Sequence, residues 1–270
     1  MSSPNPLPEA GEISPLAVIG EAVKLRVLAV QEYAKLLWRS MTNIFTPPHY
    51  WNDTLEQMDV IGVGSLPIVL LTGFFIGAVM VLQTASQFER FGQTSLTGDV
   101  VAIALVRELG PTITALLVAG RNASGIASEL GSMVVTEQVD AMRAMGTDPT
   151  RKLVTPRIVA TVFTLPLLTA LADFIGLVGG FLVALIQLRL DPVEFWTRAI
   201  DALSFGDLVQ GFSKPVVFAF IIASVGCYKG LSVRGGTQGV GRATTEAVVV
   251  ASVLTLVANF FVTRVMLAIF

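Results

Sequence analysis

The chain has 270 residues, of which 53% are hydrophobic and only 14% are charged, and its mean hydropathy is +0.71. A soluble domain would carry roughly 25% charged residues, so this composition indicates a protein embedded in a lipid bilayer. The net charge of −2 gives no reason to expect nucleic acid as a partner. A single Cys excludes an intrachain disulfide, and a single His gives poor support to haem, zinc or Ser-His-Asp chemistry, so no catalytic or metal-binding residue is assigned.

The N-terminal region divides into a tail and a helix. Residues 1–12 have neither the basic start and apolar core of a signal peptide nor the character of a transit peptide, and we predict a flexible tail. From residue 13 to 46 apolar residues recur at three- and four-residue steps, with charged residues on the opposite side. This pattern predicts an amphipathic helix in the membrane interface, with Trp38 at headgroup depth. A soluble helix packed on a partner is the alternative.

Residues 54–270 contain the hydrophobic segments of a transmembrane domain. Stretches long enough to cross a bilayer are expected at 60–83, 100–120, 153–188, 208–228 and 247–270. Pro and Gly residues interrupt the third stretch, which could therefore form one span or two.

Loop charge favours one span for this stretch. A single span places the basic residues of the N-terminal helix, of segment 121–157 and of segment 229–242 on one side of the membrane. The opposite side then holds an acidic loop and few cations, which are Arg90, Arg189, Arg198 and Lys214. Because cytoplasmic loops collect Lys and Arg, we predict five spans with a cytoplasmic N-terminus and an external C-terminus.

Small and aromatic residues within the spans each leave two interpretations open. The pairs Gly73/Gly77, Gly176/Gly180 and Gly226/Gly230 permit close helix contact, either inside one subunit or across a dimer. Phe74, Phe75, Phe88 and Phe91 lie near the outer part of the first span. They could line an apolar pocket or serve only in packing.

Arg107 and Glu108 lie inside the second apolar stretch, just before Gly110-Pro111. Charged side chains in lipid must face the bundle interior, a water-filled cavity or a headgroup. One interpretation is an interhelical ion pair, for instance with Asp173 or Arg264. The other is that Arg107 binds a lipid phosphate while Glu108 orients it, since a guanidinium matches phosphate oxygens bidentately.

The polar segment after the second span predicts a short amphipathic helix at about 128–146, which Gly146 and Asp148-Pro149 end. The chain contains no G-x-x-x-x-G-K-[ST] motif, so it cannot bind ATP by that route. A membrane protein of this kind would need a separate motor. The helix could dock into a groove on such a partner or simply rest on the membrane surface.

Several motifs together resemble the MlaE (YrbE) permeases of ABC systems that move phospholipids or other hydrophobic molecules with mammalian-cell-entry (MCE) proteins. They are V-R-E-L-G-P at 106–111, A-G-R-N-A-S at 119–124, E-L-G-S-M-V-V-T-E-Q-V-D-A-M at 129–142, D-P at 148–149 and G-V-G-R-A-T-T at 239–245. The resemblance covers nearly the whole chain. It implies a permease pair, expected to be a homodimer, a cytoplasmic ABC ATPase dimer that binds ATP and Mg, and an MCE hexamer on the periplasmic side of a bacterial inner membrane. No cofactor is then expected in this chain.

The resemblance also implies roles for particular residues. It makes part of the 128–146 segment a coupling helix that seats in the ATPase, with the residues Thr136, Glu137, Gln138, Val139, Asp140, Met142 and Arg143. It implies a lipid cavity at the dimer interface, lined mainly by the first, second and fifth spans. Arg107 and Glu108 match the family's charged pair and are expected in headgroup binding or gating. Leu82, Phe88 and Phe91 are candidates for contact with lipid tails.

The function expected from the sequence is therefore a permease subunit, not an enzyme, that moves phospholipid or a similar molecule with the help of a separate ATPase. A membrane scaffold that anchors an envelope complex without moving anything is the alternative. An intramembrane lipid-modifying enzyme is a third, much weaker one, because no acid–base or metal cluster supports it.

Overall fold

The computed structural model describes residues 15–188 and 191–269, so the predicted tail at 1–12 lies outside the described residues. This described part of the chain is helical and contains no strand, as predicted. Its α-helices are α1 (Pro15–Phe45), α2 (Trp51–Met58), α3 (Gly64–Glu89), α4 (Thr97–Ala104), α5 (Gly110–Val118), α6 (Ser124–Val135), α7 (Gln138–Ala144), α8 (Thr155–Ile186), α9 (Pro192–Asp201), α10 (Phe205–Leu231) and α11 (Gly236–Ile269). Short π or 3₁₀ turns join some of them, namely η1 (Asp59–Val63), η2 (Thr94–Leu96), η3 (Leu105–Leu109), η4 (Ala119–Ala123) and η5 (Thr150–Val154).

These elements join into five helical runs that are long and apolar enough to cross a membrane, counted within the described residues. The runs are Trp51–Glu89, Thr94–Val135, Thr150–Ile186, Phe205–Leu231 and Gly236–Ile269. The prediction of five spans is confirmed, including the single span in the third stretch. The chain is therefore a multi-pass membrane protein.

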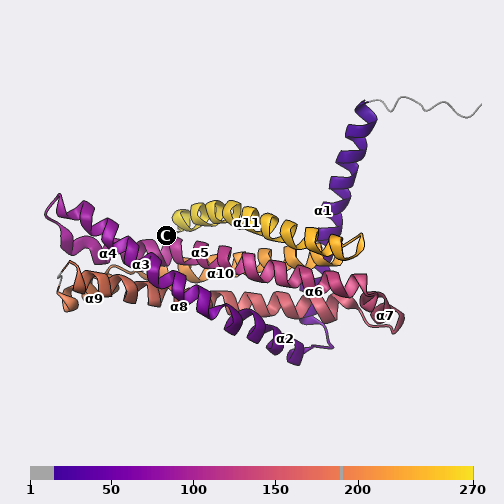
Figure 1. Cartoon of the computed structure of the whole chain (residues 1–270), viewed down its shortest axis with the longest axis horizontal. Helices are drawn as coiled ribbons and strands as arrows, with labels where there is room; N and C mark the ends of the chain where they lie inside the picture. Colours follow the sequence, from indigo (N-terminus) through magenta and orange to yellow (C-terminus); the bar gives the residue numbers. More distant parts are fainter. Residues whose placement is uncertain (1–14, 189–190, 270) are drawn as a thin grey trace, which may run out of the picture.

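The long runs lie side by side along the longest axis of the molecule (Figure 1). The helix α7 lies at one end of this bundle, and α4 and α9 lie at the other. Four of the runs form the centre, where α3 packs along α8 and α10 packs on both α8 and α6. The bundle end that holds α7 is called the α7 end below, and the opposite one the α9 end.

The second span extends further than the sequence pattern indicated. Residues 121–135, which the sequence pattern placed after the end of the second span, continue its helix through η4 and α6. The Arg121 guanidinium donates hydrogen bonds of 3.0 Å to the Val60 carbonyl oxygen and to Ser65 Oγ on the first span. Arg121 thus finds hydrogen-bond partners while its backbone stays helical. Its polarity therefore does not mark the end of the second span, which the sequence pattern placed too early.

The glycine pairs of α3 and α8 bring these two helices into direct backbone contact. A Cβ atom added at Gly73 would lie 2.7 Å from the Ala172 carbonyl oxygen, and one at Gly77 would overlap the Gly176 carbonyl. The third pair acts in the same way, because a Cβ at Gly230 would lie 3.0 Å from the Ala127 carbonyl oxygen. The structure therefore assigns these pairs to contacts within one subunit.

Replacing Gly77 by alanine should destabilise the fold. The added methyl group must push α3 away from α8, and overpacking of this kind costs about 1–3 kcal/mol. The matched control is Gly125→Ala, since a Cβ at Gly125 meets nothing within 4 Å. Thermal unfolding in detergent should show a lower midpoint for Gly77→Ala and an unchanged or higher one for Gly125→Ala; equal midpoints would contradict the close contact.

The predicted N-terminal helix is present as α1, which projects away from the bundle near its α7 end (Figure 1). Its second half is fixed to α10, because the Tyr33 and Ser224 hydroxyls lie 2.7 Å apart and the Tyr228 hydroxyl donates to the Ala29 carbonyl oxygen. Burial raises the pKa of the Tyr33 phenol. The apolar side chains Val30 and Trp38 are 67% and 73% exposed, so much of the apolar face is uncovered by the chain itself. Placement of α1 in the membrane interface stays a prediction.

Candidate functional site

The charged pair of the second span lies in a π-helical turn. Arg107 and Glu108 belong to η3, which ends at Leu109, and α5 then begins with Gly110 and Pro111. Proline has no backbone N–H and disturbs the regular pattern of helical hydrogen bonds, and π turns are frequent at functional sites. The turn directs both charged side chains towards α10, the neighbouring helix that supplies their partners.

Arg107 forms an ion pair with Asp207 through its Nε atom. Asp207 also caps α10, since one of its oxygens accepts hydrogen bonds from the backbone N–H and the hydroxyl of Ser204. The Asp207 side chain is only 2% exposed, whereas that of Arg107 is 38% exposed. Arg107 is thus held from one side while part of its guanidinium faces outwards.

The Glu108 carboxylate on the second span accepts hydrogen bonds from four donors on the fourth and fifth spans. The Lys214 ammonium group lies 2.5 Å from its Oε1 atom and also donates to the Arg107 carbonyl oxygen at 2.7 Å. The remaining donors to the carboxylate are Gln210 on α10 and Asn259 and Thr263 on α11. Lys214 is completely buried, while the Glu108 side chain is 40% exposed. The carboxylate therefore ties the second span to the fourth and fifth.

The interhelical ion pair considered for Arg107 and Glu108 is present, but the suggested partners Asp173 and Arg264 were wrong. Asp173 is buried against Gly110, and its Oδ1 atom has no hydrogen-bond partner among the described residues. Arg264 is exposed. The partners are instead Asp207 and Lys214, which sequence reasoning had not paired with either residue. A lysine next to an apolar run was a usable signal, because an unpaired cation within a span is costly.

The aromatic and aliphatic candidates of the first span lie apart from this charged cluster along the chain. Leu82 and Phe88 are half-buried near the end of α3, and Phe91 follows α3 and is 76% exposed. Phe74 and Phe75 pack edge to face, with ring centroids 5.5 Å apart. A role in contact with lipid tails stays a prediction for Leu82, Phe88 and Phe91.

At the α7 end, the segment expected as one helix over 128–146 is divided. Its first part is the end of α6, and the chain then turns at Glu137, whose φ of 60° is left-handed, before α7 begins. The β-branched run Val134-Val135-Thr136 has low helix propensity, which favours a break at this place. Thr136 and Glu137 therefore lie in the turn and not on the helix.

The candidate coupling residues differ in accessibility. Val139 is only 3% exposed and packs with Leu130 and Leu153, so it attaches α7 to the bundle and cannot itself meet a partner. Asp140 and Arg143 form an exposed ion pair of 2.8 Å. The residues Thr136, Glu137 and Gln138 are also exposed, and Met142 is half-buried. We call the exposed residues from 136 to 145 the α7 surface.

Within the described residues, no group of three or more His, Cys, Asp or Glu side chains is placed to hold a metal ion. What the structure presents is a charged cluster linking the second, fourth and fifth spans, and a polar surface at the α7 end. Ionisable side chains within spans commonly mark the substrate or ion pathways of membrane proteins.

Comparisons with known proteins specify the class. The family described as Permease MlaE matches residues 54–265. A probable ABC transporter permease protein of Rickettsia typhi is 41% identical over 234 residues, which cover 87% of this chain and 90% of that protein. The intermembrane phospholipid transport system permease protein MlaE of Haemophilus influenzae is 38% identical over 213 residues, covering 78% and 82%. The chloroplastic protein TRIGALACTOSYLDIACYLGLYCEROL 1 of Arabidopsis thaliana is 35% identical over 237 residues, covering 84% and 68%.

The five spans and these relatives define the chain as a transporter permease. It belongs to the MlaE permease family, which confirms the resemblance found in its motifs.

Proposed function

We propose that this chain is the permease subunit of an ABC complex that moves phospholipid, or a similar hydrophobic molecule, while a separate ATPase binds ATP and Mg. The observation that carries the proposal is the combination of an exposed α7 surface with a half-exposed Arg107 in a buried charged cluster. The name of the Haemophilus influenzae relative, a phospholipid transport permease, supports the choice of cargo.

Arg107 is suited to bind a lipid phosphate. Its Nε atom donates to Asp207, but its Nη1 and Nη2 atoms form no hydrogen bond with any of the described residues. These two nitrogen atoms can donate to two phosphate oxygens, and such charge-assisted bonds are the strong ones. In this proposal Asp207 fixes the orientation of the guanidinium, and Glu108 keeps the three spans in register beside it.

The complex that we propose contains two copies of this chain, an ATPase dimer at the α7 end and an MCE hexamer at the α9 end. The fifth span supports the pairing of permeases, because only 11% of its most apolar window is buried within one chain. Outward side chains such as Val257, Phe260 and Phe261 would be covered by a second copy. The proposed location is a bacterial inner membrane, with the α7 end in the cytoplasm and the C-terminus in the periplasm.

Transfer of lipid from reconstituted vesicles tests this function. With the ATPase and the MCE protein present, we expect movement of a fluorescent phospholipid to an acceptor only when ATP is hydrolysed. Transfer at the same rate without ATP would contradict the proposal and favour a scaffold. A chemically altered lipid after incubation would instead indicate an enzyme.

A further inference from the structure

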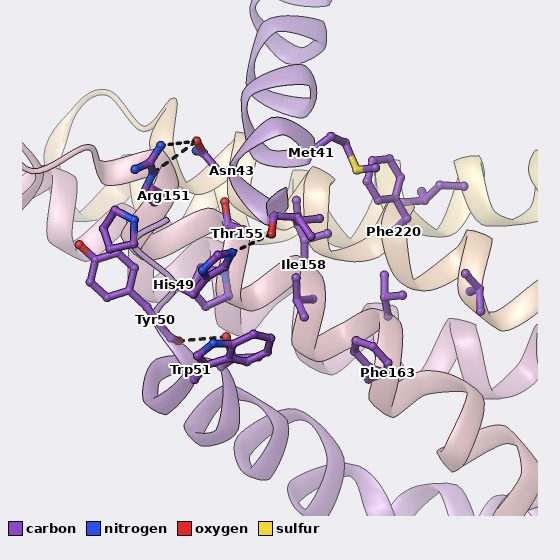
Figure 2. Close-up of a pocket in the computed structure, with 18 of the residues that line it drawn as sticks. Met41, Asn43, His49, Tyr50, Trp51, Arg151, Thr155, Ile158, Phe163 and Phe220 are labelled. Atoms are coloured by element: carbon purple, nitrogen blue, oxygen red, sulfur yellow. Dashed lines mark hydrogen bonds between the residues drawn. The ribbon is translucent and has the colours of Figure 1, made fainter. Parts of the chain in front are cut away.

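An amphipathic cavity lies at the α7 end, away from the charged cluster. It has a volume of about 610 Å³, within the usual range for ligand sites, and lies between the end of α1, the start of α2, η5, α8 and α10. Figure 2 shows Arg151 and Asn43 at one end of the cavity and Phe163 and Phe220 at the other. One end is therefore polar and cationic, and the other is apolar.

The cation at the polar end has only neutral partners. Arg151 donates to the Pro47 carbonyl oxygen at 2.8 Å, and to Asn43 Oδ1 and Thr46 Oγ1 at 3.2 Å. No ion pair of Arg151 occurs within the described ranges, whereas the neighbouring Lys152 is paired with Asp53 at 3.2 Å. The positive charge of Arg151 is thus uncompensated at the mouth of an apolar cavity, where an anionic group would be favoured.

Asn43 supplies a second, independent indication. Its side chain is 8% exposed, and its Oδ1 atom accepts from Arg151. Its Nδ2 atom, however, is buried without a hydrogen-bond partner in the part of the chain that the structure describes. A buried donor left unpaired costs about 1–3 kcal/mol, so an oxygen acceptor brought by a ligand would remove this penalty.

The cavity follows the direction of a lipid in a bilayer. Along α8 its lining runs from Thr155 to Phe163, which is eight residues or about 12 Å further into the bundle. Along α10 the lining runs from Ile221 back to Val216, also away from the α7 end. The aromatic rings of His49 and Trp51 stack beside the polar end, as is common at headgroup depth. A headgroup at Arg151 would thus place an acyl chain against Phe163 and Phe220.

We infer that this cavity holds a phospholipid of the leaflet at the α7 end, with its phosphodiester on Arg151 and Asn43 and an acyl chain between α8 and α10. This lipid occupies a site distinct from the proposed transport path at Arg107. It fills the space beneath the connection from α1 to α2 and so holds α1 against the bundle.

Photo-labelling of the purified full chain in nanodiscs tests the inference. The probes are phosphatidylglycerol and diacylglycerol that carry the same diazirine-bearing acyl chain, compared at equal mole fraction. We expect phosphatidylglycerol to label peptides 155–163 and 216–221 about tenfold more than diacylglycerol, since only it has the phosphodiester. This comparison uses the unaltered chain and needs no variant to fold. Equal labelling by both probes, or no labelling of these peptides, would overturn the inference.

Variants locate the two ends of the lipid. Val216→Trp should fill the apolar end and abolish labelling, whereas Leu171→Trp, at a similarly exposed position of α8 outside the cavity, should not. Asn43→Leu should lower labelling by phosphatidylglycerol but not labelling by diacylglycerol, and a smaller preference for phosphatidylglycerol should remain because Arg151 is kept. Equal loss in Val216→Trp and Leu171→Trp would count against the site. Because neither ATP nor a partner protein is present, the result is independent of whether the proposed transport function is correct.

Discussion

Replacing Lys214 by methionine is expected to destabilise the protein by about 3 kcal/mol, which corresponds to a melting temperature roughly 6–12 °C lower. Lys214 is completely buried and is the nearest donor to the Glu108 carboxylate. It also satisfies the Arg107 carbonyl oxygen in the π turn. Its loss leaves the partly exposed Glu108 carboxylate without its cation and the Arg107 carbonyl oxygen without its donor, and removing one partner of such a pair costs more than removing both charges.

Two variants make the test of Lys214 specific. Lys229→Met is the matched control, because Lys229 lies on the same helix, pairs with Glu246 and is 24% exposed, and its loss should cost under about 1 kcal/mol. The double variant Lys214→Met with Glu108→Gln should recover part of the stability. If thermal unfolding shows the same midpoint for Lys214→Met and the unaltered chain, the buried pair does not hold the three spans together.

Reversing the charge of Asp140 should abolish stimulation of the partner ATPase. In Asp140→Lys the new cation lies beside Arg143 on the α7 surface, so the exposed ion pair is lost and like charges repel. A partner groove complementary to the original surface would then meet an altered charge, and we expect at least about a tenfold drop in stimulated hydrolysis. Hydrolysis is measured in vesicles that contain the permease and the ATPase.

The control for this variant is Glu32→Lys on α1, which makes the same charge change at an exposed position away from α7. Membrane insertion and thermal unfolding of both variants should match the unaltered chain, because both positions are exposed. Full stimulation by Asp140→Lys would exclude α7 as the coupling element.

Much of the fold could be predicted from local properties of the sequence. The spans follow from the length of the apolar stretches, and the charge of the flanking loops correctly favoured one helix at 153–188. Span boundaries were less accurate, because Arg121 remains helical when Val60 and Ser65 on another span satisfy its guanidinium. Contacts between spans are not encoded in hydropathy.

Contacts within the candidate sites could not be predicted from the sequence either. Arg107 and Glu108 were recognised as unusual, but their partners lie about a hundred residues away and no spacing rule connects them. The resemblance placed Val139 in the partner-facing group, whereas the structure buries it in a cluster with Leu130 and Leu153. The cavity beneath α1 was not predicted at all, since three separate segments of the chain form it.

The central claim is that ATP hydrolysis at the α7 end drives lipid past Arg107. The most direct test is the amount of phospholipid transferred per ATP hydrolysed by complexes that carry Arg107→Gln. In this variant Asp207 loses its cation but keeps its bonds from Ser204, so some loss of stability is expected, and transfer per ATP is measured at a temperature at which thermal unfolding shows the complex to be folded. We predict hydrolysis within about twofold of the unaltered complex and lipid transfer per ATP at least about tenfold lower, the loss expected for a charge-assisted bond. An unchanged transfer per ATP would contradict the claim.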